Sequence, residues 1–191
     1  MSEKNHILNI FKDTGALLEG HFILTSGKHS SRYFQCAKVL QYPEYLTAFS
    51  IMIADEFEDE KPDVVISPAI GGIVLGTEVG TQLGCRTIFS ERKNGAMVIR
   101  RGFNLEPDER ALIIEDVITT GGSVKEVMSL VEKANASTLG IGVLVDRSNG
   151  DVKLHNNQYS IIKLKAESYS EDKIPDELDA IPIQKPGSRY S

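Results

Sequence analysis

Residues 112–123 read Leu-Ile-Ile-Glu-Asp-Val-Ile-Thr-Thr-Gly-Gly-Ser, an apolar run that passes into acids, hydroxyls and glycines. The stretch from Ala111 to Glu115 is typical of a strand that is covered on both faces, as in a parallel sheet. After it, apolar residues repeat with helical spacing at Val124, Val127, Met128 and Val131. The sequence therefore predicts a strand, a turn and a helix, and ligands of open α/β sheets bind beyond such strand ends.

The same alternation of strand and helix extends outward from this segment. Four more strands are expected, at Val64 to Ser67, Arg86 to Ser90, Thr138 to Val145 and Tyr159 to Leu164. Helical patterns separate them, and this order is typical of βαβ units. We therefore expect an α/β fold with a central, mainly parallel five-stranded sheet flanked by helices.

The first 60 residues have a different pattern. Ile7, Leu8 and Phe11 predict a short N-terminal helix, and a second amphipathic helix is expected after Pro43. Polar and glycine-containing residues 25–32 interrupt the pattern and predict an extended loop. We expect a single domain over 1–191, with a hood or flank at about 1–60, an α/β core at about 61–165 and a tail at about 166–191.

Composition limits the possible partners. The formal charge of −6 over 191 residues argues against broad binding of nucleic acid or anionic membranes. Cys36 and Cys85 lack the CxxC spacing of a metal knuckle or redox pair. No signal-peptide core opens the chain, and no window approaches the roughly 20 apolar residues of a membrane span. We expect a cytoplasmic protein.

The turn after the buried strand favours a phosphate next to a sugar. Gly121 and Gly122 let the backbone approach a ligand, while helix N–H groups and nearby hydroxyls can surround a phosphate. Glu115 and Asp116 would repel a phosphate but can accept hydrogen bonds from ribose hydroxyls. The alternative is that Asp116 caps a helix and the glycines form an ordinary turn. No P-loop is present, and Gly140 with Gly142 lacks the third glycine of a dinucleotide fingerprint.

This segment resembles the phosphoribosyl-pyrophosphate (PRPP) motif of the type I phosphoribosyltransferases. The resemblance implies that PRPP is a substrate and that the motif binds it, through Glu115, Asp116, Val117, Ile118, Thr119, Thr120, Gly121, Gly122 and Ser123. It also implies the fold of that family, with a small N-terminal hood and a lid.

Within the family, further segments are similar to the enzymes that use orotate. These segments are residues 21–30 with 33–35, the pyrophosphate loop 68–73, Glu91-Arg92-Lys93 at the start of the catalytic loop, Asp146-Arg147, and residues 185–189. The resemblance implies formation of orotidine 5′-monophosphate and pyrophosphate from orotate and PRPP, a step of UMP biosynthesis. A purine- or uracil-specific enzyme, or a regulator that binds PRPP without chemistry, are the alternatives.

Several side chains outside the motif are further candidates. A guanidinium can hold a carboxylate with two hydrogen bonds, so we expect Arg147 to bind orotate together with Thr119. Lys28, Arg92 and Lys93 are expected to contact PRPP, and Lys93 is also expected to be catalytic. Each also has an ordinary interpretation as a solvated surface residue. His29 is equally ambiguous, and it is not expected to bind a metal with His21.

Two departures from the family affect the diphosphate site. Ile70-Gly71 stands where many relatives have an aromatic residue and a lysine, and the catalytic loop lacks a second lysine and a histidine. Asn94-Gly95 predicts a β-hairpin. We expect a hairpin lid with the basic residues Arg92, Lys93, Arg100 and Arg101, although an ordinary surface hairpin would give the same pattern.

The resemblance also implies a mechanism and an assembly. Mg²⁺ would accompany the diphosphate and water, since Mg²⁺ keeps waters and no dedicated protein ligand set is evident. Asp116 and Glu115 would face the cationic sugar, and no covalent nucleophile is needed. The family implies a homodimer with active sites shared across the interface.

Overall fold

The computed structural model describes residues 3–24, 27–164 and 167–184. Residues 185–189, and Thr25 and Ser26 within 21–30, belong to the segments named for their resemblance and lie outside the described residues. The helices are α1 (Glu3–Asp13), α2 (Ala37–Leu40), α3 (Pro43–Asp55), α4 (Gly71–Leu83), α5 (Gly122–Lys133) and α6 (Asp176–Asp179), with short 3₁₀ turns η1 (Glu58–Glu60) and η2 (Glu171–Lys173). The strands are β1 (Leu17–Ile23), β2 (His29–Phe34), β3 (Val64–Pro68), β4 (Arg86–Lys93), β5 (Ala96–Ile99), β6 (Arg110–Ile118), β7 (Ser137–Asp146), β8 (Gln158–Lys163), β9 (Ser168–Tyr169) and β10 (Ile183–Gln184).

Contacts between residues divide the chain into two compact units, and the larger one comprises residues 40–164. Its sheet has the strand order β5-β4-β3-β6-β7-β8. The five strands from β4 to β8 in this order are parallel to their neighbours, as the sequence predicts. The sixth strand, β5, is antiparallel to β4 and comes from the expected hairpin. The predicted α/β fold class is therefore confirmed.

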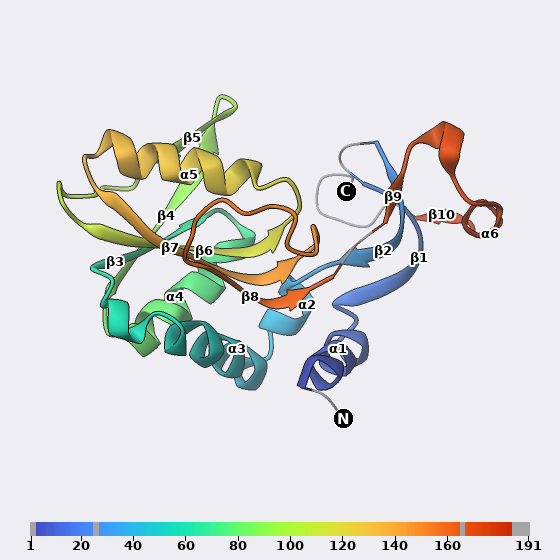
Figure 1. Ribbon diagram of the computed structural model, residues 1–191, viewed down its shortest axis with the longest axis horizontal. Helices are drawn as coiled ribbons and strands as arrows, with labels where there is room; N and C mark the ends of the chain where they lie inside the picture. The colour runs from blue at the N-terminus through green and yellow to red at the C-terminus, as the bar shows by residue number, and fades with distance from the viewer. Residues whose placement is uncertain (1–2, 25–26, 165–166, 185–191) are drawn as a thin grey trace. The chain divides into compact units, whose positions relative to one another are not determined.

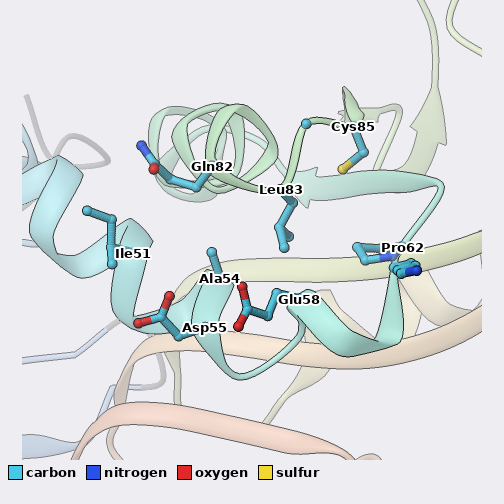
Figure 2. A pocket seen from close by; sticks show the side chains of 10 residues that line it. Ile51, Ala54, Asp55, Glu58, Pro62, Gln82, Leu83 and Cys85 are labelled. Atoms are coloured by element: carbon cyan, nitrogen blue, oxygen red, sulfur yellow. The ribbon is translucent and has the colours of Figure 1, made fainter.

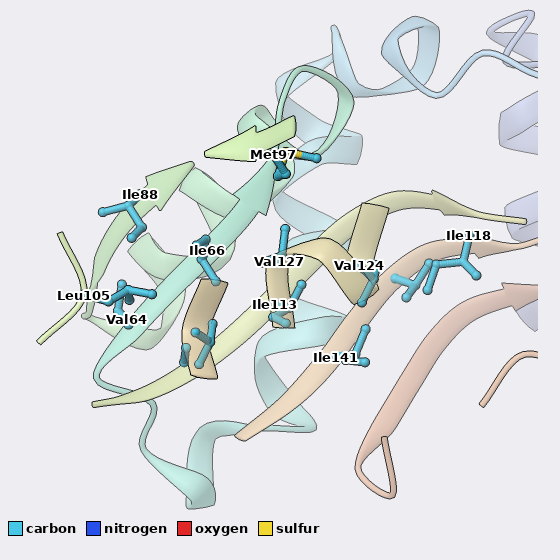
Figure 3. Packing of buried hydrophobic residues seen from close by; sticks show 13 residues of the cluster. Val64, Ile66, Ile88, Met97, Leu105, Ile113, Ile118, Val124, Val127 and Ile141 are labelled. Atoms are coloured by element: carbon cyan, nitrogen blue, oxygen red, sulfur yellow. The ribbon is translucent and has the colours of Figure 1, made fainter. Parts of the chain in front are cut away.

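Helix α5 covers one face of this sheet, and α3 and α4 cover the other (Figure 1). Val124, Val127 and Val131 are buried on α5 and pack with side chains of β3, β6 and β7, including Ile66, Ile113 and Ile141 (Figure 3). Fully burying each such side chain contributes about 1.5–3 kcal/mol. The apolar spacing after Ser123 therefore marks the face of α5 that holds it on the sheet.

The opposite face depends on glycines where helices approach strands closely. A side chain on Gly76 of α4 would overlap Ser67, and one on Gly142 of β7 would lie 2.6 Å from Ile53 of α3. Gly140 and Gly142 lie inside β7 and make room for α3 and the residues after it. This packing role agrees with the expectation that they are no dinucleotide fingerprint.

The second unit comprises residues 1–39 and 165–191. Its described part contains α1, whose Ile7 and Phe11 are buried as expected, and a sheet with the order β10-β1-β2-β9. This sheet is missing from the sequence prediction, which places an extended loop where β2 begins. The larger unit begins near residue 40 and includes α3, because α3 packs against α4. The expected boundary near residue 60 lies later, and the division into one domain with a hood and a tail stays a prediction.

In the described part of the chain, helices are all too short or too polar to cross a lipid bilayer.

Candidate functional site

The chemistry-bearing segments of the larger unit lie at one edge of its sheet. Strands β3, β6 and β7 run parallel and end at Pro68, Ile118 and Asp146. Ile118 and Asp146 are register partners, and the N–H of Arg147 donates to the carbonyl oxygen of Ile118 over 2.8 Å. The structure therefore brings Arg147 next to the turn that begins at Thr119, as the sequence led us to expect.

The turn from Thr119 to Gly121 leads into α5 and forms an anion-binding geometry. Gly121 adopts a left-handed conformation with φ of 74°, and no side chain caps the helix. The first N–H groups of α5 therefore remain available to a ligand, and the helix dipole favours a negative charge there. Thr119 and Thr120, which precede this helix start, are exposed, and Ser123 in the first turn of α5 is half-buried.

The two acids just upstream differ in environment. Glu115 is only 7% exposed, whereas Asp116 is half-buried. Burial, the negative charge of Asp116 and a side-chain hydrogen bond with Asp116 raise the pKa of Glu115 well above its usual value. Glu115 Oε1 also accepts the N–H of Asp116, and Asp116 Oδ1 accepts the N–H of Val117. The pair therefore combines a buried acid, whose pKa is raised, with a more accessible one.

Asp116 also packs against the pyrophosphate loop. A side chain on Gly71, the first residue of α4, would overlap the Asp116 carboxylate, and one on Gly72 would lie 2.9 Å from the carbonyl oxygen of Ile114. No side chain caps α4, and Ile70 before it is 83% exposed. Gly71 stands where many relatives have a lysine, and a side chain there would require the Asp116 carboxylate to move.

The basic hairpin forms as predicted. Asn94 and Gly95 both have positive φ and join β4 to β5, with Lys93 opposite Ala96. Three of the four expected lid cations bind carboxylates of the same chain. Arg92 lies 2.9 Å from Glu126 of α5, while Arg100 and Arg101 lie 3.1 and 3.0 Å from Glu91.

Lys93 differs from these three cations. It is exposed, and within residues 3–24, 27–164 and 167–184 it takes part in no ion pair. Sequence reasoning missed Glu91 as an ion-pair partner and missed Glu126 altogether. The charge pattern indicates neither pairing, because Glu126 is 34 residues from Arg92 and Glu91 is 10 residues from Arg101.

Lys28 and both candidate histidines belong to the smaller unit. Lys28 is exposed in the turn before β2, and its contact with PRPP stays a prediction. His21 and His29 are buried, and Nε2 of His21 lies 2.6 Å from Nδ1 of His29 in a hydrogen bond. His29 therefore has a structural partner in the hairpin of β1 and β2, where an extended loop was expected.

A pocket of about 320 Å³ lies away from this edge, beside the carboxyl ends of α3 and α4. Figure 2 shows Glu58, Gln82 and Cys85 among its lining side chains. Burial raises the pKa of the Cys85 thiol, so that thiol stays protonated and is a poor nucleophile. The pocket lies apart from the turn after β6 and from the β4–β5 hairpin, and none of the candidate site residues lines it.

The described residues contain no group of three or more His, Cys, Asp or Glu side chains that could hold a metal ion. A divalent ion at this site would therefore depend on oxygens of a ligand and of water, with Asp116 as the accessible carboxylate nearby.

Comparison with protein-family models matches residues 37–174 to the phosphoribosyl transferase domain. This match covers the sheet, the turn after β6 and the hairpin. The chain belongs to the phosphoribosyltransferase family. Two curated relatives of this phosphoribosyltransferase are named orotate phosphoribosyltransferase. The one from Chlorobium phaeobacteroides strain BS1 is 60% identical over 96% of this chain and 95% of its own, and the one from Thermoanaerobacter sp. strain X514 is 48% identical over 98% of each.

Solved structures show the same fold at low sequence identity. An orotate phosphoribosyltransferase from Aeropyrum pernix is 21% identical and has a TM-score of 0.64, covering 74% of this chain and 81% of its own. An adenine phosphoribosyltransferase from Thermoanaerobacter pseudethanolicus is also 21% identical, with a TM-score of 0.59 over 70% and 88% of the two chains. Because enzymes for different bases share the fold, the fold of this phosphoribosyltransferase does not by itself select a base.

Proposed function

We propose that this phosphoribosyltransferase joins orotate to the ribose C1 of PRPP, giving orotidine 5′-monophosphate and pyrophosphate in UMP biosynthesis. Full-length relatives up to 60% identical carry that activity in their names. The structural observation that carries the proposal is the hydrogen bond between Arg147 and Ile118, which puts a guanidinium-bearing residue beside the candidate PRPP turn. Orotate differs from uracil by a carboxylate, and a guanidinium is the group that recognises it bidentately.

In this proposal the motif turn holds PRPP. The N–H groups of Gly122 and Ser123 and the hydroxyls of Thr119 and Thr120 bind the 5′-phosphate, since they surround an uncapped helix N-terminus. Asp116 accepts hydrogen bonds from the ribose hydroxyls. Glu115 is buried beside it, and burial together with the negative charge of Asp116 raises the pKa of Glu115.

The chemical step separates charge, and the chain supplies groups for both ends. As the C1–O bond to pyrophosphate breaks, positive charge develops on the sugar and negative charge on the leaving group. The Asp116 carboxylate stabilises the sugar, while Lys93 and the lid arginines stabilise the pyrophosphate. The backbone N–H groups at the start of α4 assist there, in place of the family lysine that Gly71 lacks.

Mg²⁺ fits this site as a companion of the substrate. The family typically uses PRPP with Mg²⁺, and among the described residues no preformed cage competes with the diphosphate for the ion. When bound, the ion neutralises charge on the diphosphate. The diphosphate and water would supply its ligands, and the Asp116 carboxylate would be the nearby group that could bond to those waters.

The partners of the proposal include a second copy of the chain. A homodimer would let the lid of one subunit, with Lys93, close over the site of the other. Lys28 would contact the diphosphate or ribose. We place the reaction in the cytoplasm, without nucleic-acid or membrane partners, on the basis of the acidic composition.

A pyrophosphate-release assay with orotate, uracil and adenine tests the function. Release is expected with orotate, PRPP and Mg²⁺ together, and little with the other two bases. Release with adenine or uracil but not with orotate would show that the enzyme uses a purine or uracil as its base. PRPP binding without release for any base would favour the regulator.

A further inference from the structure

Asp146, the last residue of β7, is fully buried although it carries a carboxyl group. A buried carboxylate is costly unless its oxygens accept hydrogen bonds. Asp146 Oδ1 accepts the N–H and the hydroxyl of Ser148 over 2.8 and 2.6 Å, and its Oδ2 accepts the N–H of Gly150 over 3.0 Å. Its side chain therefore organises the four residues that follow it.

Arg147 is the residue enclosed by this arrangement. Its own N–H is fixed to Ile118 of β6, and the next N–H along the chain is fixed to Asp146. The backbone carbonyl of Asp146 accepts the N–H of Leu164, which anchors the strand end from the other side. The start of the Arg147 side chain is thus set by bonds on both sides, before any ligand arrives.

The rest of the loop is braced in the same way and reaches the PRPP turn. Ser148 Oγ accepts the N–H of Val152, and the Gln158 amide bonds the carbonyl of Val152 and the N–H of Leu154. A side chain on Gly121 would lie 2.7 Å from Leu154 and 3.1 Å from Val152. The loop that carries Arg147 therefore packs directly on the glycine that opens α5.

We propose that Asp146 is a positioning residue for base recognition, which holds Arg147 in the orientation that receives the orotate carboxylate. This rests on the proposed function, since it takes Arg147 as the base-binding residue. If Arg147 is already held in its binding orientation, less conformational entropy of its side chain and loop is lost when orotate binds. Removing hydrogen bonds of Asp146 should therefore weaken orotate binding and leave PRPP binding nearly unchanged, because those bonds go to Ser148 and Gly150, whereas the residues proposed to bind the phosphate lie between β6 and α5.

The test is a double-mutant cycle with Asp146→Asn and Arg147→Ala, with KM for each substrate, kcat and thermal unfolding as readouts. Asparagine keeps the shape of the side chain, but its NH₂ group replaces one of the two oxygens that accept hydrogen bonds from Ser148 and Gly150. The bonds to that oxygen are therefore lost. We expect KM for orotate to rise about tenfold in each single variant. The double variant should match Arg147→Ala alone, because Asp146 acts through Arg147. KM for PRPP should change less than about twofold.

The matched control is Asp63→Asn. Asp63 Oδ2 accepts the backbone N–H of Arg110 at the opposite edge of the sheet, so the same chemical change there should leave both KM values unaltered. Ser148→Ala is a second, milder variant, which removes the hydrogen bonds of the Ser148 hydroxyl to Asp146 and to Val152. It tests the positioning role if Asp146→Asn does not fold. It should raise KM for orotate by about twofold or more without an equal effect on PRPP.

The outcomes separate the two proposals. If Arg147→Ala leaves orotate kinetics unchanged, the base-binding role in the proposed function fails. If Arg147→Ala weakens orotate use but Asp146→Asn and Ser148→Ala do not, the positioning role fails while the proposed function stands. Equal effects on both substrates, or effects that add fully in the double variant, would reduce Asp146 to a residue of general stability.

Discussion

At the scale of single residues, the accessible carboxylate is the one we expect to act. Asp116→Asn keeps the shape of the side chain and removes its charge, so turnover should fall roughly 10- to 150-fold, corresponding to a charge-assisted hydrogen bond of about 1.5–3 kcal/mol. The unfolding temperature should change little. Steady-state kinetics beside a thermal melt check this, and normal turnover in a folded variant would leave Asp116 as an ordinary turn residue.

Glu115 gives a prediction about pH. The unfolded chain ionises this side chain near the usual value of 4.5, whereas the folded chain retains the proton to higher pH because its pKa is raised. The folded state then binds more protons than the unfolded state, so stability falls as pH rises from about 4.5, by up to roughly 1.4 kcal/mol per pH unit.

Glu115→Gln removes this titration while keeping a similar volume. The variant should gain stability relative to the parent as pH rises through the weakly acidic range. Below pH 4.5 the difference between their free energies of unfolding should no longer change with pH. Denaturant unfolding from pH 4 to 8 measures the difference. Two curves that stay parallel over this range would show that Glu115 ionises normally.

At the scale of elements, the hairpin of β4 and β5 is held by the carboxylates that its arginines bind. The Arg92–Glu126 pair is exposed, with side chains 43% and 42% accessible, so it contributes only about 0.2–1 kcal/mol. In the proposed function the diphosphate must compete with Glu126 for Arg92. Glu126→Gln should therefore lower KM for PRPP by about 1.5- to 5-fold, and added salt should reduce the difference.

A matched ion pair provides the control for the hairpin. Glu60 lies 3.2 Å from Arg110 with similar exposure, 49% and 44%, at the opposite edge of the sheet. Glu60→Gln should leave KM for PRPP unchanged. A rise in KM for the Glu126→Gln variant would mean that Glu126 supports the productive position of Arg92.

At the scale of the whole molecule, assembly of the active site across a homodimer is the remaining prediction. A Lys93→Ala chain is mixed with an Asp116→Asn chain, each of which has reduced activity alone. If Lys93 acts in the partner's site, mixed dimers contain one site with both native groups, and activity should return to about a quarter of the native value per site at equal mixing. Assays of each variant alone give the baseline.

Subunit exchange must be followed in the same experiment, for example by the mass of differently tagged chains. If mixed dimers form and no activity returns, Lys93 serves its own subunit or the hairpin has no catalytic part.

The sequence by itself determined the α/β class, the five parallel strands, the α5 turn and the Asn94-Gly95 hairpin. Each of these is encoded within a short window, because apolar periodicity and turn chemistry act between near neighbours. The candidate PRPP turn could be recognised for the same reason, since its acids, hydroxyls and glycines are contiguous from Glu115 to Ser123.

Only the tertiary structure decided which distant groups meet. The buried ring of His21 has the carbonyl oxygen of Ile181 and the ring of His29 as hydrogen-bond partners, and β1 pairs with β10 although some 160 residues separate them. The fit of Asp116 against Gly71 and the ion pair of Arg92 with Glu126 depend equally on how strands and helices align. Such contacts form only once strands and helices have aligned in the assembled fold, and a local sequence pattern carries no record of them.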